Sequence, residues 1–212
     1  VNPCCKLLKS SKPRWHLCYR LNVPMDLPGN LDFRKRLLQL AQTNFEWKKR
    51  LWTLCANDIH FWTSCFLWTY DPRREENQKE VPFIEWPYQV DAIDIIQEHI
   101  GKSDLFIDKS RDMGATWMVL VVFLWHWIFR RHESFTLISR KADMVEKAGD
   151  TDTLFWKLDF MLDRLPSWMR PDLTDIDLNM TNNENGSVMS GTATTGDAAV
   201  GGRRCGCSRR RC

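Results

Sequence analysis

This chain of 212 residues has little excess charge and few cysteines in its body. Its 30 lysines and arginines stand against 27 aspartates and glutamates, and the net charge of +3 is too small to indicate nucleic acid or an anionic membrane as a partner. Of its 8 cysteines, only Cys55 and Cys65 lie outside residues 1–18 and 205–212. The body of the chain is therefore not a disulfide framework, and we expect a reduced, intracellular protein.

The sequence also lacks an uncharged run long enough to span a membrane. Residues 113–129 contain no charged side chain, but they fall short of the roughly 20 residues that a spanning helix needs. The run contains His126 and begins in a glycine-containing turn, which favours a buried helix of an α/β core. The first 20 residues have no apolar signal segment. We therefore expect a soluble protein of the cytoplasm.

The composition itself is that of a folded protein. Hydrophobic residues make up 43% and charged residues 27%, which excludes disordered and collagen-like chains. The length suits one large domain or one and a half small ones. We divide the chain into an unmatched stretch at 1–24 that is a candidate non-native leader, a helical region at 25–80, an α/β core at 81–204 and a Cys/Arg-rich tail at 205–212.

The helical region contains a candidate basic face. Residues 26–55 have the periodicity of one amphipathic helix, with apolar positions at Leu37, Leu38, Ala41, Phe45, Trp52 and Cys55. The other face carries Arg34, Lys35, Arg36, Lys48, Lys49 and Arg50. Such a face either contacts solvent, which is the commoner case, or binds a phosphate backbone.

The α/β core alternates short apolar strands with helices. A helix from Gln89 to Ile100 ends at Gly101, and Leu105 to Ile107 has the character of a buried strand. The predicted elements that follow are the helix at 113–129, a strand at 135–138, a helix at 155–165 capped by Thr151 or Asp152, and a hairpin with strands at 178–181 and 187–192. This order predicts a mostly parallel α/β sheet.

The most informative segment is the turn between the strand at 105–107 and the next helix. Free backbone N–H groups and the helix dipole make such a turn a good phosphate site. Aligned on Gly114, the phosphate-loop pattern G-x-x-x-x-G-K-[ST] is matched at Gly114 and Thr116 but not at its first glycine or its lysine. Lys109 and Arg111 lie earlier in the turn and can supply the missing cation. On spacing alone, an ordinary glycine turn explains the segment equally well.

Several separate blocks of the sequence resemble one family. The segment KSRDMGATW resembles the variant Walker A loop of phage large terminases, in which the basic residue stands near the start of the loop. Four further blocks are similar to the same family in residue sequence and in their order along the chain. They are FWTSCFLWTYDPR, PFIEWPYQVDAI, LISRKADMVEKAGDTDTLFWKLDFMLDRLPSWMRP and NENGSVMSGTATTGDAAVGGRR. The resemblance covers about residues 32–204.

This resemblance implies a fold and an activity. The fold would be a RecA-like P-loop NTPase core, incomplete here, with helices flanking a mostly parallel sheet. The activity would be that of a viral packaging motor, which binds ATP and Mg²⁺ to drive double-stranded DNA into a procapsid in the bacterial host cytoplasm. The partners would be DNA, the portal and the small terminase subunit, and intact relatives would form a homo-oligomeric ring.

The resemblance also assigns roles to residues. The nucleotide-binding residues would be Gln89, which reads adenine, and the loop of Lys109, Ser110, Arg111, Asp112, Met113, Gly114, Ala115, Thr116 and Trp117. Lys109 and Arg111 would hold the triphosphate, and Thr116 would bind Mg²⁺. The segment Ser139, Arg140 and Lys141 follows the second strand, at the position where open α/β sheets place ligand-binding loops. The alternative is that these residues form an ordinary solvent-exposed turn. Arg203 and Arg204 would sense the γ-phosphate.

The chain departs from the family pattern after Arg204. The family continues with an apolar strand that ends in Asp-Glu, but here Cys205 to Cys212 contain only Cys, Gly, Ser and Arg. Three cysteines without histidine make a poor metal site, so we interpret the tail as a frameshift. Without those carboxylates Mg²⁺ would be poorly held and the attacking water not oriented, so we expect ATP binding but no hydrolysis. The family's nuclease domain has no counterpart in this sequence either. The alternatives are a non-enzymatic DNA-binding or assembly module that uses the basic helix, and a fragment of a helicase-type ATPase.

Overall fold

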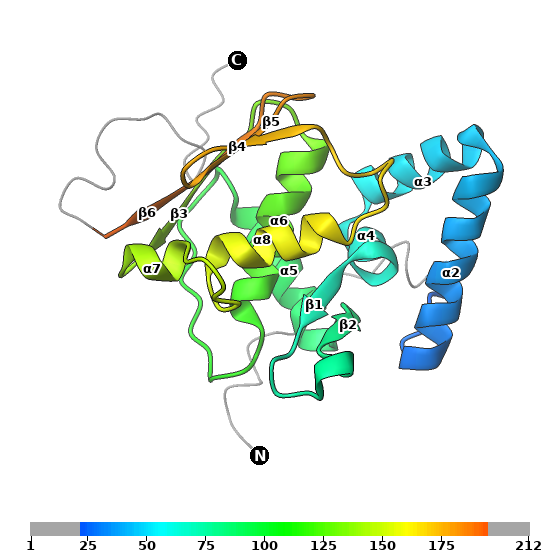
Figure 1. Cartoon of the computed structure of the whole chain (residues 1–212), viewed down its shortest axis with the longest axis horizontal. Coiled ribbons are helices and arrows are strands. Elements are labelled where there is room, and N and C mark those ends of the chain that lie inside the picture. Colours follow the sequence, from blue (N-terminus) through cyan, green and yellow to red (C-terminus); the bar gives the residue numbers. More distant parts are fainter. Residues whose placement is uncertain (1–21, 195–212) are drawn as a thin grey trace. The chain divides into compact units, whose positions relative to one another are not determined.

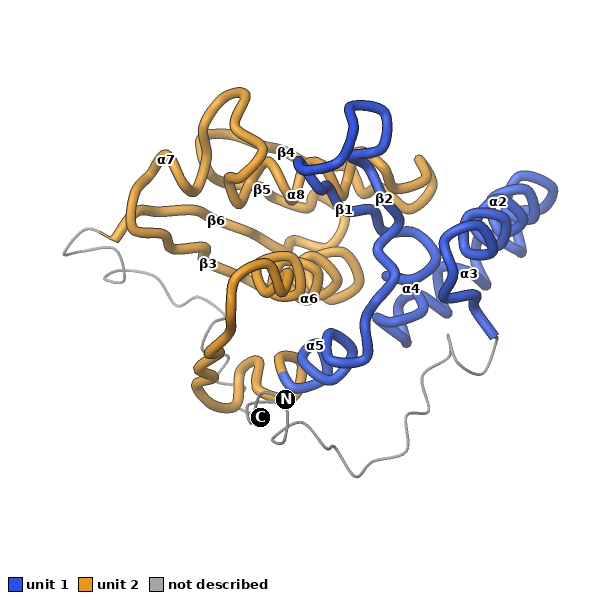
Figure 2. The backbone as a smooth tube through the Cα atoms, turned by 90° about the horizontal axis from the view of Figure 1, so that it is seen from below, with its two compact units in different colours: residues 1–95 blue, residues 96–212 orange. Residues whose placement is uncertain are grey.

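The computed structural model describes residues 22–194, and the chain divides into two compact units (Figures 1 and 2). Unit 1 comprises residues 1–95 and unit 2 residues 96–212. The division falls within one helix, α5 (Pro87–His99). The predicted tail at 205–212, most of the predicted leader, and Arg203 and Arg204 lie outside the described residues.

Unit 1 is mainly helical. Its elements are α2 (Leu27–Thr43), α3 (Phe45–Asn57), α4 (Ile59–Phe66), β1 (Trp68–Tyr70), the short 3₁₀ helix η2 (Glu76–Gln78), β2 (Glu80–Pro82) and most of α5. β1 and β2 pair in antiparallel fashion, with Trp68 opposite Pro82. The predicted helical region is therefore helical, and it ends in a small two-stranded sheet.

The prediction of a single amphipathic helix at 26–55 is wrong, because two helices, α2 and α3, occupy this stretch. The break is Asn44, whose backbone is extended and whose side chain accepts a hydrogen bond from the Glu46 N–H at 2.8 Å. Asp58 starts α4 in the same way by accepting from the Phe61 N–H at 2.8 Å. Short polar side chains compete well for free N–H groups at helix starts, and this competition outweighs the continuous periodicity.

The prediction that Arg34 belongs to an exposed basic face is also wrong. Arg34 is buried and donates hydrogen bonds to the Leu67 carbonyl at 2.8 Å, the Thr63 carbonyl at 3.2 Å and the Asn30 side chain at 2.7 Å. It therefore adds a second, charged donor to carbonyls at the end of α4 that also accept from the Leu67 and Phe83 N–H groups. Burial lowers the pKa of Arg34 to about 10, which still leaves it charged at neutral pH.

A buried charged cluster joins α4 to α5 within unit 1. The His60 ring donates from Nδ1 to Glu85 at 2.6 Å and from Nε2 to Asp94 at 3.0 Å. Burial opposes protonation of His60, but the charge of Glu85 and the hydrogen bonds that the ring donates to both carboxylates outweigh it and raise the pKa of His60 to about 10. His60 is thus a cation that neutralises a carboxylate with almost no exposure to water.

We predict that His60→Gln destabilises the protein by about 3–5 kcal/mol, because it leaves Glu85 as a buried charge without a counterion. The pKa of His60 is raised above its value near 6.5 in the unfolded chain. Its contribution to the free energy of unfolding is therefore complete below pH 6.5 and is lost as the pH rises through 10. Urea unfolding from pH 6 to 10 measures both effects.

The matched control is Arg73→Gln, which breaks the exposed ion pair with Asp71 and should cost less than about 1 kcal/mol. The wild-type chain should lose stability relative to His60→Gln as the pH rises. Parallel pH profiles for the two proteins would show that His60 is not a buried cation.

Unit 2 is an α/β layer structure, which confirms the predicted α/β class. After the end of α5 its elements are α6 (Ala115–Phe129), β3 (Ser134–Ser139), α7 (Ala142–Val145), α8 (Leu154–Asp163), β4 (Leu173–Asp175), β5 (Asn179–Asn182) and β6 (Val188–Ala193). The four strands form one sheet in the order β3, β6, β5, β4. Thr153 caps α8 by accepting from the Trp156 N–H, so the predicted caps Thr151 and Asp152 are wrong by one or two positions.

The sheet is mixed rather than mostly parallel, which corrects the prediction. β3 and β6 are parallel, whereas the β6 to β5 and β5 to β4 pairs are antiparallel. The predicted hairpin is present and supplies one of these antiparallel pairs, because the tight turn at Asn185 and Gly186 can only join strands of opposite direction. A parallel pair joined by α6 would need a strand on each side of this helix. Only β3 is present, because the strand predicted at 105–107 does not form among the described residues.

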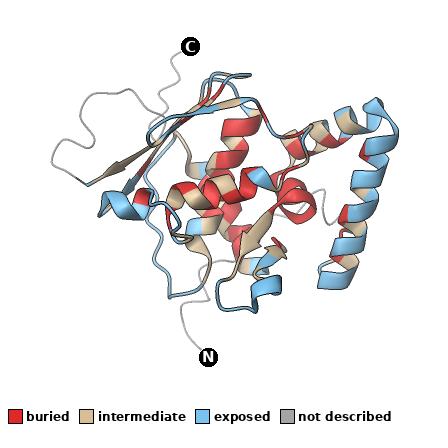
Figure 3. Ribbon diagram, in the orientation of Figure 1, coloured by how far each residue is buried: buried red, intermediate tan, exposed pale blue. Residues whose placement is uncertain are grey.

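α6, α7 and α8 cover the same face of this sheet. Phe123 of α6 stacks on Phe135 of β3 with ring centroids 4.6 Å apart, and a side chain at Gly191 of β6 would meet Val145 and Phe155. Both contacts fall on the face where Phe135 pairs with Met189 and Leu137 with Gly191. Figure 3 shows the resulting concentration of buried residues along α6 and α8. None of the described helices is long and apolar enough to cross a membrane.

The turn of the hairpin holds the carboxyl end of α6. Asn182 and Asn185 each donate a hydrogen bond to the Trp127 carbonyl, at 3.0 and 2.8 Å, and Asn185 also donates to the Ile128 carbonyl at 3.0 Å. The Ser187 hydroxyl donates to the Arg130 carbonyl at 3.0 Å. The segment NENGS in the sequence therefore has a structural role, since it satisfies carbonyls that a helix end leaves free.

The predicted strand from Leu105 to Ile107 does not form among the described residues. This segment is extended, but 37%, 91% and 40% of Leu105, Phe106 and Ile107 are exposed, and its backbone makes no hydrogen bond to another described residue. An extended segment becomes a strand only when a neighbour pairs with it. The helix before it ends as predicted, with Gly101 in the left-handed region at φ 69°.

We predict that Gly191→Ala destabilises unit 2 by about 1–3 kcal/mol through overpacking. The added methyl group would lie 2.7 Å from the Phe155 ring and closer still to Val145. Thermal unfolding measures the loss, and the double variant Gly191→Ala with Val145→Ala should recover part of it. Equal melting temperatures for Gly191→Ala and the wild type would contradict this close approach.

Candidate nucleotide-binding site

The loop before α6 adopts a conformation that leaves the start of the helix open. Asp112 and Gly114 both lie in the left-handed region, at φ 62° and φ 72°. Gly114 is the N-cap, and no side chain caps the helix. The first intrahelical bond runs from the Met118 N–H to the Gly114 carbonyl at 3.0 Å. The N–H groups of residues 115–117 therefore point out of the helix start, where the dipole favours an anion.

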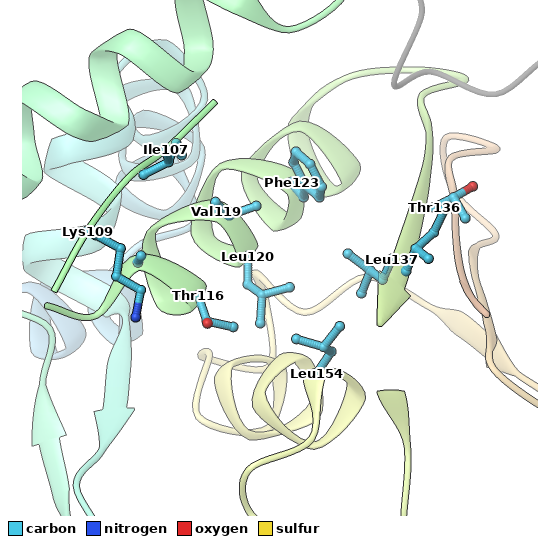
Figure 4. Close-up of a pocket in the computed structure, with 11 residues that line it drawn as sticks. Ile107, Lys109, Thr116, Val119, Leu120, Phe123, Thr136, Leu137 and Leu154 are labelled. Atoms are coloured by element: carbon cyan, nitrogen blue, oxygen red, sulfur yellow. The ribbon is translucent and has the colours of Figure 1, made fainter. Parts of the chain in front are cut away.

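Two of the predicted phosphate and metal ligands line one cavity beside this helix start. A cavity of about 370 Å³ is lined by Lys109, Ala115 and Thr116 at its polar end. Figure 4 shows the Lys109 side chain extending along the first turn of α6 toward the Thr116 hydroxyl. Lys109 is exposed, so its ammonium group keeps contact with water and can donate to a phosphate oxygen without a large desolvation cost.

The rest of this cavity is apolar. Its remaining walls come from α6, from β3 and from the start of α8, with Val119, Leu120, Phe123, Leu137, Ile138 and Leu154 among them. The sequence contains no spacing signal for this apolar part, because its residues come from three elements that only the tertiary fold brings together. A charged triphosphate suits the Lys109 end of the cavity and not this remainder.

Other predicted loop residues lie elsewhere. Ser110, Arg111, Asp112, Met113 and Trp117 do not line the cavity. Arg111 is exposed, so Lys109 is the cation that the fold brings to Thr116. Trp117 packs edge-on against Phe160 of α8, with centroids 6.0 Å apart, and therefore serves the core. No group of three His, Cys, Asp or Glu side chains in residues 22–194 is arranged to hold a metal ion.

Gln89 has a structural partner in unit 1. Its side-chain oxygen accepts a hydrogen bond from the Trp86 N–H at 2.9 Å, and only 6% of the residue is exposed. This is one half of a capping box at the start of α5. This bond uses the side-chain oxygen, so the amide NH₂ group could still donate to a ligand. Recognition of adenine by Gln89 stays a prediction.

The residues after β3 stand beside the end of β6. The Ser139 carbonyl accepts hydrogen bonds from the Thr194 N–H at 2.8 Å and from the Thr194 hydroxyl at 3.0 Å. Arg140 and Lys141 are exposed. The predicted γ-phosphate sensors Arg203 and Arg204 lie outside the described residues, so the geometry of the site rests on the loop, α6 and β3.

Comparison with known proteins does not assign the chain to a family. No protein-family model matches the chain, and no curated protein matches it either.

Proposed function

We propose that the chain is a nucleotide-binding module of the P-loop class that binds ATP with Mg²⁺. The observation that carries the proposal is that Lys109 and Thr116 line one cavity beside the uncapped start of α6. A cation, a hydroxyl group and free helical N–H groups are the three kinds of group that a triphosphate and its metal ion require. An ordinary glycine turn would need none of them to share one cavity.

Each group has a distinct role in this proposal. The N–H groups of residues 115–117 hold phosphate oxygens, and the helix dipole adds to their attraction. Lys109 neutralises charge on the terminal phosphates, and the Thr116 hydroxyl is a ligand for Mg²⁺. Mg²⁺ held at Thr116 would supply positive charge that stabilises the phosphate oxygens. The left-handed φ of Gly114 lets the backbone approach the phosphates without a side chain in the way.

The larger assignment is the ATPase domain of a viral DNA-packaging motor. It rests on the five sequence blocks that resemble phage large terminases, from FWTSCFLWTYDPR to NENGSVMSGTATTGDAAVGGRR. Double-stranded DNA, the portal and the small terminase subunit are the partners that this assignment proposes. The NENGS part of the last block has a structural role in unit 2, because Asn185 and Ser187 donate hydrogen bonds to carbonyls at the end of α6.

Lys109→Ala should weaken binding of ATP with Mg²⁺ by about 10–100-fold, since a hydrogen bond to a charged group is worth about 1.5–3 kcal/mol. Titration calorimetry with a non-hydrolysable ATP analogue measures the effect. Thr116→Val should remove the dependence of binding on Mg²⁺ and leave metal-free binding nearly unchanged.

Two variants serve as controls for this prediction. Lys102→Ala removes an exposed lysine from a turn of the same unit that does not line the cavity, and it should leave affinity within about twofold. Arg111→Ala should weaken binding less than Lys109→Ala, because Arg111 lies away from the cavity lining. Wild-type protein that binds no nucleotide would reject the proposal.

A second candidate function is DNA contact through α3. Arg50 stacks on Trp47 with its guanidinium carbon 5.4 Å from the ring centroid, and 37% of Trp47 is exposed. Lys49 is exposed on the same helix. An aromatic ring beside cations on an exposed helix is the combination that stacks on bases and neutralises phosphates. This observation favours α3 over α2, whose Arg34 is buried.

If α3 binds DNA, the triple variant Lys48→Ala, Lys49→Ala, Arg50→Ala should flatten the slope of log affinity against log salt concentration by about 2 to 3, because up to three phosphate contacts are lost. Fluorescence anisotropy with a labelled duplex from about 50 to 200 mM salt gives this slope. Arg111→Ala should bind DNA like the wild type, and an unchanged slope in the triple variant would exclude α3.

A further inference from the structure

The hairpin turn that anchors α6 contains the only Asn-Gly pair in the sequence, Asn185 and Gly186. An asparagine that precedes glycine loses its side-chain amide more readily than other asparagines do. The following backbone nitrogen attacks the amide carbon, and glycine has no side chain to hinder this approach. The pair is therefore a candidate site of spontaneous modification, and its reactivity depends on how the fold holds both residues.

The contacts of residue 185 require an asparagine. Its amide nitrogen donates to the Trp127 carbonyl at 2.8 Å and to the Ile128 carbonyl at 3.0 Å. Its side-chain oxygen accepts a hydrogen bond from the Ser187 N–H at 2.8 Å. An amide side chain can donate and accept in this way, whereas an ionised aspartate could donate to neither carbonyl. The bonds that hold the end of α6 thus depend on the amide group.

The backbone of residue 186 requires a glycine. It lies in the left-handed region at φ 73°, and a Cβ atom there would be 2.8 Å from Nδ1 of the His132 ring. Any other residue would be strained and would collide with this ring. The His132 N–H in turn donates to the Asn185 carbonyl at 3.1 Å. The turn therefore needs both members of a chemically labile pair.

The same contacts protect the pair while the chain is folded. The attack needs the Gly186 nitrogen and the Asn185 side-chain carbon to close a five-membered ring. In the fold the Gly186 N–H donates to the Asn182 carbonyl at 2.9 Å, and three hydrogen bonds fix the Asn185 amide. These bonds must open before the ring can close. The reaction is therefore controlled by local opening of the turn.

We propose that Asn185 is a deamidation site, which the folded hairpin protects and which reacts when the turn opens. The Gly186 nitrogen forms a bond to Cγ of Asn185, the bond from Cγ to Nδ2 breaks, and ammonia leaves with the proton of the attacking nitrogen. The succinimide ring then takes up one water molecule and opens to aspartate or isoaspartate. The net change is the replacement of one amide by one carboxylic acid, with water consumed and ammonia released.

The product would release the carboxyl end of α6. A carboxylate at 185 cannot donate to the Trp127 and Ile128 carbonyls, and its charge would stand where the helix dipole is also negative. Trp127 would keep the bond from Asn182 at 3.0 Å, whereas Ile128 would lose its Asn185 donor. The proposal concerns the far end of α6 and does not depend on nucleotide binding at its start.

Mass spectrometry of a proteolytic digest tests the site. The full chain is kept in mildly alkaline buffer, either folded or in urea, and the mass increase from amide to acid is followed at residue 185. In urea, Asn185 should react before Asn182 and Asn183, which precede bulkier residues. In the folded chain Asn185 should react at least about tenfold more slowly than in urea, because its hydrogen bonds must open first.

Two serine substitutions provide a matched comparison. The Ser187 hydroxyl donates to the Arg130 carbonyl at 3.0 Å and accepts from the Glu133 N–H at 3.2 Å, so Ser187→Ala loosens the turn but keeps the Asn-Gly pair. It should speed the reaction of the folded chain about fivefold or more and leave the rate in urea unchanged. Ser167 is exposed, and Ser167→Ala should leave both rates within about twofold.

Asn185→Asp tests the consequence for α6. It should lower the melting temperature by about 5–10 °C, since two bonds to carbonyls are lost and a charge is added at the helix end. Asn179→Asp adds the same charge at an exposed position of β5 and should shift the melting temperature by less than about 2 °C. If Asn185→Asp does not fold, wild-type chain aged in urea replaces it, because converted chains should be depleted from the refolded fraction.

Any one of three results would overturn the proposal. The first is an equal rate of reaction at residue 185 in the folded and the unfolded chain. The second is a folded Ser187→Ala protein that reacts no faster than the wild type. The third is an Asn185→Asp protein as stable as Asn179→Asp, or a refolded fraction from which converted chains are not depleted.

Discussion

The hydrogen bonds that hold the carboxyl end of α6 are the constraint on which unit 2 depends. Asn182 and Asn185 bind the Trp127 carbonyl and so fix α6 against the hairpin of β5 and β6. β6 in turn pairs along the whole of β3, and Phe123 stacks on Phe135. Because α6 is rigid, fixing its far end also fixes where its uncapped start stands. The candidate phosphate site is therefore positioned by a loop at the opposite end of the helix.

The sequence predicted the elements whose signals are local. α6, α8, β3 and the hairpin of β5 and β6 lie where periodicity and the Asn-Gly turn place them. The failures concern pairing and burial, which depend on partners far away in the chain. Leu105 to Ile107 has strand composition but no described neighbour, and Arg34 has a charge but ends up on the carbonyls of α4. No window of sequence contains either partner.

The candidate site was predictable in part for the same reason. The pattern around Gly114 and Thr116 is local, so the loop and the helix start could be predicted from spacing. The choice between Lys109 and Arg111 depends on the path of the loop through the left-handed Asp112 and Gly114, which spacing does not determine. The burial of His60 as a cation could not be predicted from the sequence, since a histidine and a glutamate 25 residues apart form no periodic pattern.

The cavity beside α6 combines two chemistries, and a triphosphate uses only one of them. Charged oxygens gain nothing from Val119 and Phe123, because they would lose their water there without new partners. Lys109, Thr116 and the free N–H groups at the start of α6 therefore determine where phosphates would lie, at the loop end of the cavity. The apolar remainder has a different role, because the stacking of Phe123 on Phe135 packs α6 against the sheet and so holds that helix start in place.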